Sequence, residues 1–390
     1  MIAQKPVTPP HVCIVGLGNL PVLAPEYSNR PAGGEELQHT LLARALVRRG
    51  WRVSMVVADH GQADGATWDE VKTYKAYRPD EGLPVVRFLH PRWTKLHNAL
   101  QRADADVYYT SCAGAQLAQV VLFAHRHGRK VAFRVASDSD CDPRSLLVRY
   151  WRDRQLYRWG LERADLVLVQ TLPQQRTLAD NFGRQSRVAG PIVEPAGRRP
   201  AFSERDIDAL WVANLRALKR PQLFLDAAAR LPRLTFHMAG ARAPGEEAVY
   251  EEARIRAESL PNVTFHGFVP QHRIGALFER ARVHVSTSDV DGFPNTFLQA
   301  WSRGTPVVTF LDPGNIVSSN GMGAAVSDAG ELSAAIARLA QDPADWQARS
   351  SSSARYFDEQ LNESRTVSVY LQALSALLAP PPAASVVLGA

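Results

Sequence analysis

Residues 288–308, SDVDGFPNTFLQAWSRGTPVV, place a glycine turn directly before an amphipathic helix and a short apolar strand. Gly292 allows the tight turn, and Pro294 suits the first turn of a helix, where its missing N–H is not needed. The backbone N–H groups near Asn295 and Thr296 would lie at the helix N-terminus, where the helix dipole favours an anion. The segment therefore predicts a strand-to-helix loop able to hold a phosphate.

On both sides of this segment, short apolar runs alternate with amphipathic runs along the chain. Strands are expected at 12–16, 51–57, 106–110, 130–136, 165–169, 209–213, 234–240, 262–267, 283–287 and 306–310. Helices are expected at 35–49, 115–128, 145–163, 221–231, 245–259 and 271–280. This alternation predicts an α/β protein with parallel sheets covered by helices on both faces.

The alternation stops at residues 190–206, where Pro, Gly and charged residues replace the apolar periodicity. At 390 residues the chain exceeds what one hydrophobic core usually serves. We expect two Rossmann-like domains, 1–195 and 196–359, with parallel sheets facing a central cleft. Ligands of such sheets bind outside the carboxyl ends of the strands, so the loops there are the candidate site.

Composition narrows the class of partner. A net charge of +6 and a pI near 9.3 suit nucleic acid, anionic lipid or nucleotide phosphates alike. No zinc-finger spacing, RNP-type strand or Lys-rich tail is present, so no nucleic-acid partner is expected. Three cysteines without a paired spacing argue against a disulfide framework or zinc cluster. Without an apolar run of about 18 residues or a signal-peptide core, a cytoplasmic protein is expected.

Two glycine pairs follow or precede predicted elements in the first half. Gly16-x-Gly18 follows the first strand, but the third glycine of a dinucleotide-binding fingerprint would fall at Pro21, where no helix is expected to begin. The helix begins instead at Gly33-Gly34, whose open backbone N–H groups suit an anion or a sugar hydroxyl. A tight turn with no ligand is the alternative for this pair.

Arg216 and Lys219 lie in the loop after a predicted strand of the second half. A guanidinium and an ammonium three residues apart can both face a diphosphate and neutralise charge on a departing nucleotide. A solvated basic turn is the alternative.

Two Asp-x-Asp triplets, at 138–140 and 289–291, raise the alternative of a divalent metal bridging a diphosphate. Because Arg216 and Lys219 already supply positive charge, we expect no metal and no cofactor.

Five segments in order and spacing carry a family resemblance: AGGEELQHTLLARALVRRGWRVSMV, ERADLVLVQT, WVANLRALKRP, LPNVTFHGFVP and DGFPNTFLQAWSRGTPVV. The chain resembles the GT-B glycosyltransferases of family 4, retaining enzymes that use nucleotide sugars. The resemblance implies the GT-B fold, a first domain that binds the acceptor and a second that binds the donor. A C-terminal helix at about 360–379 would complete the first domain, with 380–390 as a tail. Metal is not normally needed in this family.

The resemblance also implies roles for individual residues. The Gly33-Gly34 loop would face the donor phosphates and the acceptor, and the Arg/Lys pair the diphosphate. Asp291 would contact the donor sugar and Gln299 the ribose. The remaining donor-binding candidates are Asn214, Gly267, Phe268, Val269, Gly292, Phe293, Pro294, Asn295 and Thr296, with 267–269 holding the base. The acceptor-side candidates are Ser137 and Glu35.

Several positions depart from the family pattern. Asp291 and Gln299 stand where glutamates are usual, which shortens one acid and makes the other a neutral amide that can still bind a diol. Loss of charge assistance at Gln299 would cost about 1 kcal/mol. The usual arginine position is Asn214, with Arg216 two residues later, so Lys219 is the safer assignment.

A third departure lies after the strand at 130–136, where the family often has a histidine. Ser137 and Asp138 occupy that place. Asp138 could bind a sugar hydroxyl or help to take the acceptor's proton, and a solvated turn is the alternative.

Residues 145–163 interleave arginines with tyrosine and tryptophan. Such a helix suits an anionic membrane surface and a lipid-linked acceptor, whereas the ordinary alternative packs the aromatics into the domain. The function expected is retaining transfer of a sugar, from a UDP-sugar or next a GDP-sugar, to a carbohydrate or lipid-linked acceptor in bacterial polysaccharide or glycoconjugate synthesis. A nucleotide-sugar epimerase and a non-catalytic nucleotide-sugar-binding partner are the alternatives. The protein would be cytoplasmic, with possible peripheral contact at the inner face of the membrane.

Overall fold

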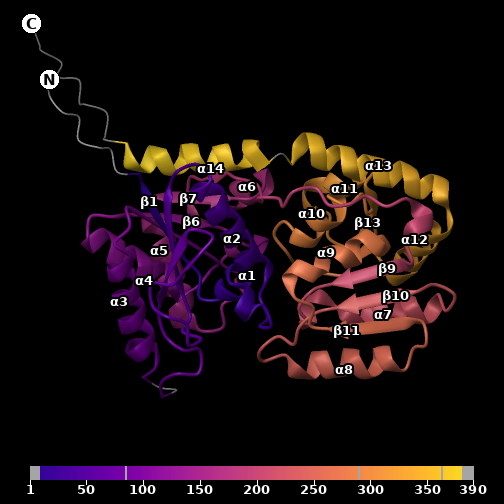
Figure 1. The fold of residues 1–390 in the computed structure, drawn as a ribbon, viewed down its shortest axis with the longest axis horizontal. Coiled ribbons are helices and arrows are strands. Elements are labelled where there is room, and N and C mark those ends of the chain that lie inside the picture. Colours follow the sequence, from indigo (N-terminus) through magenta and orange to yellow (C-terminus); the bar gives the residue numbers. More distant parts are fainter. Residues whose placement is uncertain (1–8, 84–85, 289, 362, 380–390) are drawn as a thin grey trace, which may run out of the picture.

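Two α/β halves lie side by side in the computed structural model, which describes residues 9–83, 86–288, 290–361 and 363–379 (Figure 1). The first half holds an eight-stranded sheet of order β3-β4-β2-β1-β5-β6-β7-β8. Its strands are β1 His11–Val15, β2 Arg52–Val57, β3 Thr67–Trp68, β4 Val71–Lys75, β5 Val107–Ser111, β6 Lys130–Arg134, β7 Leu166–Val169 and β8 Arg187–Val188. All neighbouring strands pair in parallel except β3 and β4.

The second half holds a six-stranded parallel sheet of order β11-β10-β9-β12-β13-β14. Its strands are β9 Ile207–Val212, β10 Phe236–Ala239, β11 Val263–Gly267, β12 Ala281–Ser286, β13 Val307–Thr309 and β14 Gly323–Ala325. The two parallel sheets confirm the predicted fold class. Residues 189–201, between the halves, form no helix or strand.

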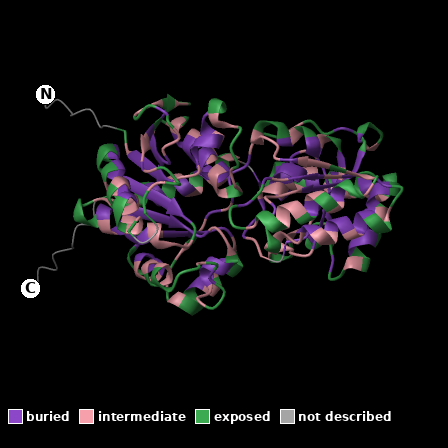
Figure 2. Ribbon diagram, turned by 90° about the horizontal axis from the view of Figure 1, so that it is seen from below, coloured by how far each residue is buried: buried purple, intermediate pink, exposed green. Residues whose placement is uncertain are grey.

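Helices cover both faces of each sheet, so the strands are buried and the outward helix faces are exposed (Figure 2). The α-helices are α1 Leu20–Leu23, α2 Gly34–Val47, α3 Thr94–Ala103, α4 Ala115–Arg126, α5 Trp151–Arg163, α6 Leu172–Phe182, α7 Pro221–Arg230, α8 Glu247–Glu258, α9 Gln271–Arg280, α10 Asn295–Trp301, α11 Ile316–Ser319, α12 Ala329–Gln341, α13 Pro343–Gln360 and α14 Glu363–Leu378. Short helical turns are η1 Pro25–Tyr27, η2 Phe88–Trp93, η3 Asp138–Cys141, η4 Phe202–Glu204, η5 Ala217–Lys219 and η6 Pro313–Asn315.

Alternate residues of β1 show how one strand serves two cores. Cys13 and Val15 pack with α3, α4 and α5, whereas Val12 and Ile14 pack with α2 and α14. Because successive side chains of a strand point to opposite faces, each face receives its own apolar layer. The all-apolar sequence of this strand follows from burial on both sides.

The last two helices run along one side of the molecule and belong to different halves (Figure 1). Phe357 of α13 packs in the second half beside α9 and α10. Tyr370 and Leu374 of α14 pack in the first half against α2 and β1. Tyr370 Oη also donates a hydrogen bond of 3.1 Å to the carbonyl of Gly190. The chain therefore returns to the first half, as a C-terminal helix at about 360–379 would require.

Two local expectations were wrong. The helix expected from residue 145 begins at Trp151, because the backbone of Tyr150 is extended. The carbonyl of Tyr150 accepts the first helical hydrogen bond, from the N–H of Arg154. The four-residue helix α1 begins beside Pro21, where no helix was expected. Burial of Leu20 and Leu23 stabilises α1, and the proline sits in its first turn, where it is tolerated.

Candidate active site

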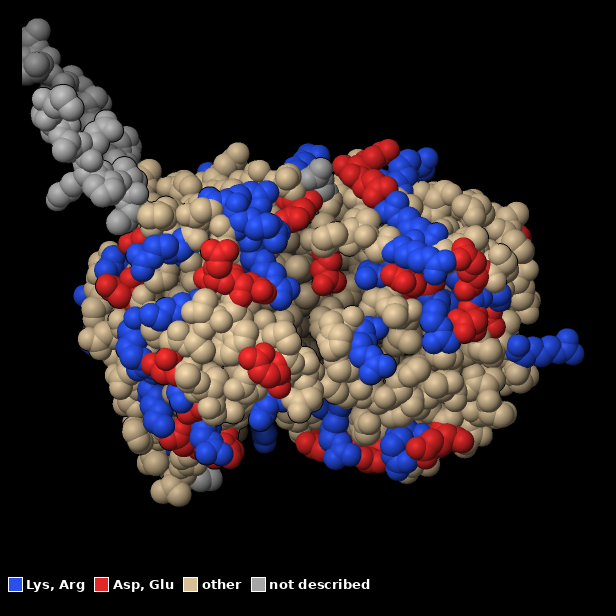
Figure 3. Space-filling model, viewed as in Figure 1, with Lys and Arg blue, Asp and Glu red and all other residues tan. Residues whose placement is uncertain are grey.

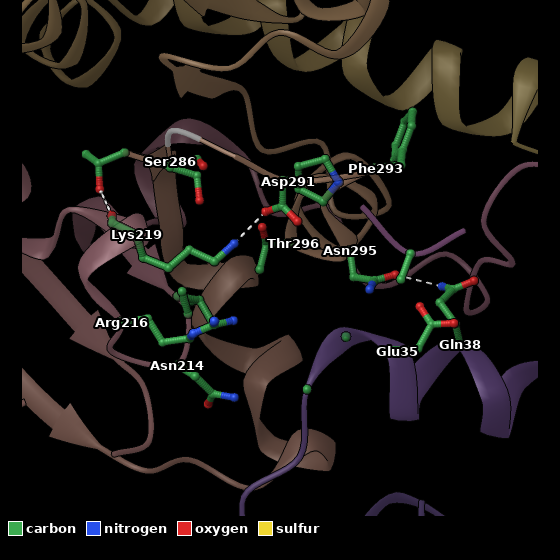
Figure 4. A pocket seen from close by; sticks show the side chains of 18 of the residues that line it. Glu35, Gln38, Asn214, Arg216, Lys219, Ser286, Asp291, Phe293, Asn295 and Thr296 are labelled. Carbon is green, nitrogen blue, oxygen red and sulfur yellow. Dashed lines mark hydrogen bonds and ion pairs between the residues drawn. The ribbon is translucent and has the colours of Figure 1, made fainter. Parts of the chain in front are cut away.

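A cavity of about 320 Å³ lies between the carboxyl ends of the two sheets. We call it the central cavity. Its lining residues from the first half are Gly33, Gly34, Glu35, Gln38, Arg134, Ala136 and Gln170. Those from the second half are Trp211, Val212, Ala213, Asn214, Arg216, Lys219, Val285, Ser286, Thr287, Ser288, Asp291, Phe293, Pro294, Asn295 and Thr296. Figure 4 shows side chains of both halves facing this space.

Lys219 lies at the end of η5 and reaches into the central cavity (Figure 4). Its Nζ lies 2.5 Å from Oδ2 of Asp291. The carbonyl of Lys219 accepts a 2.6 Å bond from Oγ1 of Thr287, which itself accepts from Nε1 of the buried Trp211 at 2.9 Å. These two hydrogen bonds fix the backbone of the loop at Lys219. The side chains of Lys219 and Asp291 stay partly exposed, at 20% and 27%.

Arg216 precedes η5 and is exposed at the edge of the central cavity. Its Nε lies 3.2 Å from Oε1 of Glu246, so a ligand would compete with this carboxylate. Asn214 lines the same cavity, and its Nδ2 donates to the carbonyl of Ala32 at 3.4 Å. Arg216 and Lys219 thus line the same cavity, and Lys219 is paired with Asp291, another candidate residue.

The turn before α10 contacts the first half closely. A Cβ on Gly292 would lie 2.3 Å from the carbonyl oxygen of Ala136, and the N–H of Phe293 donates to Oε1 of Gln170 at 3.4 Å. Pro294 is the N-cap residue, so the expectation that it lies in the first helical turn was wrong: α10 begins at Asn295. With only seven residues, α10 makes a weak helix dipole.

Gly33 and Gly34 begin α2 opposite that turn. The N–H of Gly33 donates to Oε2 of Glu36 at 2.8 Å, which caps the helix. A Cβ on Gly34 would lie 2.2 Å from Nδ2 of Asn295, in the other half. The missing side chain at Gly34 therefore allows the two halves to approach. Beside it, Nε2 of Gln38 donates to Oδ1 of Asn295 at 2.7 Å.

A second cavity of about 130 Å³ continues from the central cavity past Gly33 and Asn214. We call it the side cavity. Phe268, Val269 and the buried Gln299 line it, so three of the expected nucleotide contacts share one space. Thr296 faces both cavities. Gly267 is buried at the end of β11, where its φ of +61° suits glycine, and does not line the cavity.

Glu35 faces the central cavity through a buried ion cluster. Both its carboxylate oxygens accept from Nη1 of Arg134, at 3.1 and 3.0 Å, and Arg134 is only 1% exposed. Burial opposes ionisation of Glu35, but the nearby Arg134 and His39 and a hydrogen bond from Ser111 together hold the carboxyl pKa below its usual range. Burial lowers the pKa of His39, 3.5 Å from Glu35, to about 4. At neutral pH the cluster is one carboxylate, one guanidinium and a neutral imidazole.

Ser137 and Asp138 lie beside the central cavity and do not line it. Ser137 caps η3, and Oδ1 of Asp138 accepts from Nε2 of Gln174 at 2.8 Å. The N–H of Asp138 donates to the carbonyl of Asp291 at 3.4 Å. Desolvation raises the pKa of Asp138, and the negative Asp291 adds to the rise. This is the direction a proton acceptor near neutral pH requires.

The Asp-x-Asp triplets do not form a paired cation site in the described structure. Asp140 is buried and its Oδ2 accepts from the N–H groups of Ala136 and Ser137. Asp289 lies outside the described residues. Over 9–83, 86–288, 290–361 and 363–379, no three His, Cys, Asp or Glu side chains come together as metal ligands would.

The side chains of the site that sequence reasoning missed include Arg134, Gln170, Trp211 and Gln38. Arg134 has a signal, since an arginine within the apolar run KVAFRVA must find a buried partner. Gln170 and Trp211 lie at the carboxyl ends of strands, where site residues are expected. Gln38 is polar on the otherwise apolar face of α2, and binds both halves through Asn295 and Ile192.

The aromatic residues of 145–163 differ in burial. Tyr157 is fully buried and donates to the carbonyl of Asp140 at 2.8 Å, and Trp159 packs partly against the core. Tyr150 and Trp151 are 55% and 75% exposed. In the described part of the chain, every helix is too short or too polar to cross a bilayer.

Comparisons with known families and structures agree on one class of protein. Residues 33–190 match the model of the glycosyl transferase 4-like domain, and residues 206–342 match that of glycosyl transferases group 1. The chain is 31% identical over 170 residues to a D-inositol 3-phosphate glycosyltransferase of Geodermatophilus obscurus. That match covers 37% of this chain and spans only 38% of the relative's length.

Solved structures match nearly the whole chain at low identity. Sucrose-phosphate synthase from Thermosynechococcus elongatus has a TM-score of 0.76 at 19% identity, covering 95% of this chain and 99% of its own. Anabaena Alr3699/HepE, in complex with UDP and glucose, has a TM-score of 0.72 at 15% identity, with 94% and 99% covered. At these identities the likeness shows the fold alone.

Proposed function

Because the chain belongs to the group 1, family 4-like glycosyltransferases of GT-B fold, we propose that it transfers a sugar from a nucleotide diphosphate sugar with retention of anomeric configuration. The preferred donor is a UDP-sugar, with a GDP-sugar next. The acceptor is a carbohydrate or a lipid-linked sugar, in bacterial polysaccharide or glycoconjugate synthesis. The likeness to Alr3699/HepE, solved with UDP and glucose, supports the choice of UDP.

The observation that carries this proposal is the pairing of Lys219 with Asp291 at 2.5 Å in the central cavity. A partly exposed ammonium whose partner can be replaced is suited to a donor diphosphate. When the phosphates take over Lys219, the carboxylate of Asp291 becomes available to a hydroxyl of the donor sugar. The base and ribose would lie in the side cavity, against Phe268, Val269 and Gln299.

The reaction breaks the bond between the anomeric carbon and the diphosphate oxygen and forms a bond from that carbon to an acceptor oxygen. Lys219 and Arg216 stabilise the negative charge of the leaving diphosphate. The departing phosphate accepts the acceptor's proton on the same face, and Asp138, with its raised pKa, is a second acceptor nearby. The contacts between the halves limit access of water to the reacting sugar.

Metal independence belongs to the same proposal, since the two cations offer the charge that a divalent ion otherwise supplies. We expect EDTA to leave the transfer rate unchanged. If EDTA abolished transfer and Mg²⁺ or Mn²⁺ restored it, metal independence would be contradicted.

Peripheral contact with the inner face of a membrane, through the exposed Tyr150 and Trp151, is also part of the proposed function. Sedimentation with anionic vesicles at low salt tests that contact.

The deciding experiment screens UDP, GDP, ADP and dTDP by thermal shift, because a ligand that binds only the folded protein raises its melting temperature. UDP-sugars and GDP-sugars are then assayed for release of nucleotide and for transfer to sugar acceptors. We expect the largest shift with UDP and release from a UDP-sugar, with the product's anomeric configuration, measured by NMR, matching the donor's. Tight UDP binding without release from any donor would favour a non-catalytic nucleotide-sugar binder, and a changed sugar without transfer would favour an epimerase.

A further inference from the structure

Four hydrogen bonds form a closed ring that crosses between the two halves twice. The N–H of Phe293 donates to Oε1 of Gln170 at 3.4 Å, and the N–H of Gln170 donates to Oε1 of Gln174 at 2.8 Å. Nε2 of Gln174 donates to Oδ1 of Asp138 at 2.8 Å, and the N–H of Asp138 donates to the carbonyl of Asp291 at 3.4 Å. Asp291 and Phe293 are two residues apart in the turn before α10, so the ring closes there.

Polar contacts of this kind are needed to align the halves, because the apolar cores of the halves are separate. Apart from the segment that joins the halves, each of the four apolar clusters draws its residues from one half. On the face drawn in Figure 3, a furrow separates the halves. The ring therefore helps to fix how the turn at Asp138 lies against the turn at Asp291.

Gln170 connects the end of the first sheet to the second half. It is buried and lines the central cavity. Its Nε2 donates to the carbonyls of Val135 and Ala136, just beyond β6, at 3.1 and 2.9 Å. Because both of these groups are acceptors, the amide nitrogen must face them, and Oε1 is left to face the N–H of Phe293.

Gln174 has one orientation that satisfies both of its neighbours. Its side chain is buried in the first turn of α6, where Oγ1 of the N-cap residue Thr171 accepts from its N–H at 3.2 Å. A backbone N–H can only donate, so the atom that faces the N–H of Gln170 is Oε1, and Nε2 then faces Asp138. Among the described residues, Oδ2 of Asp138 accepts no hydrogen bond, and this side chain is exposed beside the central cavity.

We propose that Gln174 is a positioning residue which, with Gln170 behind it, makes Asp138 the proton acceptor of the transfer reaction. The inference rests on the proposed function and selects Asp138, rather than the departing phosphate, as the group that takes the proton. The O–H bond of the acceptor breaks, and its proton joins Oδ2 of Asp138. The acceptor oxygen bonds the anomeric carbon, and the diphosphate leaves with the electron pair of the bond that it loses. The ring holds this carboxylate at a fixed place relative to Asp291.

The surroundings of Asp138 act on its ionisation in opposite directions. Desolvation raises the pKa of Asp138, the hydrogen bond from Gln174 lowers it, and the negative Asp291 raises it further. Gln174 therefore favours the ionised form, which is the form that accepts a proton. Two other titratable groups lie on the same turn. Burial raises the pKa of Asp140 to about 6 and that of Cys141 to about 12, so the titration of Asp140 must be told apart from that of Asp138.

The test follows the carboxyl group of Asp138 itself. Full-length protein that carries aspartate labelled with ¹³C at the side-chain carboxyl carbon is titrated by NMR, and the signal that Asp138→Asn removes belongs to Asp138. Gln174→Glu keeps an oxygen for the N–H of Gln170 and replaces the donor NH₂ by oxygen. We expect the midpoint of the Asp138 titration to rise by about one pH unit or more, because a hydrogen bond to the ionised form is lost and a like charge is gained.

The same proteins are assayed for sugar transfer across a range of pH. In the unchanged protein, kcat/KM should fall at acid pH as Asp138 is protonated. Asp138→Asn should lower kcat/KM about tenfold or more and remove this acid dependence. In Gln174→Glu the fall should move to higher pH by about one pH unit or more, so that raising the pH restores much of the rate. A purely structural role of Gln174 would instead lower the rate equally at every pH.

Two further variants control for added charge and for failure to fold. Gln175→Glu makes the same change one residue along α6, where Nε2 of Gln175 donates to the carbonyl of Ser186 at 2.7 Å. It should leave the Asp138 titration and the pH profile unchanged. Gln174→Met removes the donor without adding a charge, so the midpoint should rise by less than in Gln174→Glu. Gln174→Met also decides the question if Gln174→Glu does not fold.

An unchanged Asp138 titration in the Gln174 variants would overturn the inference. So would an acid dependence of the rate that stays in place while the titration moves, or one that persists in Asp138→Asn. An equal shift in Gln175→Glu would show a general effect of charge on this helix and would overturn the inference as well. Each of these results, in a protein that transfers sugar, contradicts this inference alone. The absence of transfer from every donor contradicts the proposed function, whether or not the titration moves.

Discussion

The two walls of the central cavity hold their charges in opposite ways. On the second-half wall, Lys219 and Asp291 are partly exposed and carried by turns, so a ligand can replace either partner. On the first-half wall, Arg134 is buried and its Nη1 donates to both carboxylate oxygens of Glu35, beside a neutral His39. One wall therefore offers charge to a ligand, while the other uses charge to fix the shape of α2 and the Gly33-Gly34 turn.

The largest effect is expected from breaking the ion pair between Arg134 and Glu35 on the first-half wall. Arg134→Met removes the guanidinium and leaves Glu35 without its counter-ion, and breaking such a buried pair costs about 3 to 5 kcal/mol of the free energy of unfolding. Denaturant unfolding measures the loss. Arg129→Met is the matched control, since Arg129 pairs with Asp104 at the surface and should contribute about 1 kcal/mol or less.

The double variant Glu35→Gln with Arg134→Met identifies the cause of that loss. It removes the uncompensated charge, so the protein should recover much of its stability. A double variant as unstable as Arg134→Met would show that lost packing, rather than the charge of Glu35, sets the cost. The charges of the first-half wall would then not be what stabilises it.

On the second-half wall, the pair of Lys219 and Asp291 is broken by removing the lysine. Lys219→Ala should lower kcat/KM for the donor tenfold or more, about 1.4 kcal/mol of transition-state stabilisation, with little change in melting temperature. Lys219→Arg should keep part of the rate because the charge remains. Lys72→Ala, at an exposed lysine of β4, is the control. An unchanged rate in Lys219→Ala would remove Lys219 from the site.

The same contrast explains what the sequence could predict. Most strands and the parallel character of both sheets follow from apolar periodicity, and the loops of Lys219 and Asp291 follow from glycine, proline and charge within a few residues. Arg134 and Gln170 were missed because their roles depend on partners brought together only by folding. The start of α5 was wrong for a similar reason, since residues 145–150 have composition compatible with a helix but an extended end at Tyr150.

The junction between the walls is tested at Gly292. Its φ is not left-handed, so the constraint is space: a Cβ would lie 2.3 Å from the backbone oxygen of Ala136 and 2.7 Å from Nε2 of Gln170. Gly292→Ala should hold the walls apart and lower kcat/KM about fivefold, roughly 1 kcal/mol. Gly190→Ala is the control, because no atom lies within 4 Å of its added Cβ. Equal rates in both variants would mean that this contact is not needed for turnover.

The smallest effect is expected at Gln299, whose amide lines the side cavity with no charge to offer. If it binds the ribose hydroxyls, the protein should bind UDP about threefold more tightly than 2′-deoxyuridine diphosphate, which lies within the about 0.5 to 1.5 kcal/mol that one neutral hydrogen bond contributes. Gln299→Leu should abolish that preference, and Gln299→Glu should increase it because an ionised acceptor binds more strongly. Gln347→Leu, on the exposed face of α13, should leave it unchanged. Calorimetric titration of both nucleotides measures the preference. If Gln299→Leu still prefers UDP, the ribose lies elsewhere, and Lys219 is then the tested residue of the second-half wall that contacts the donor.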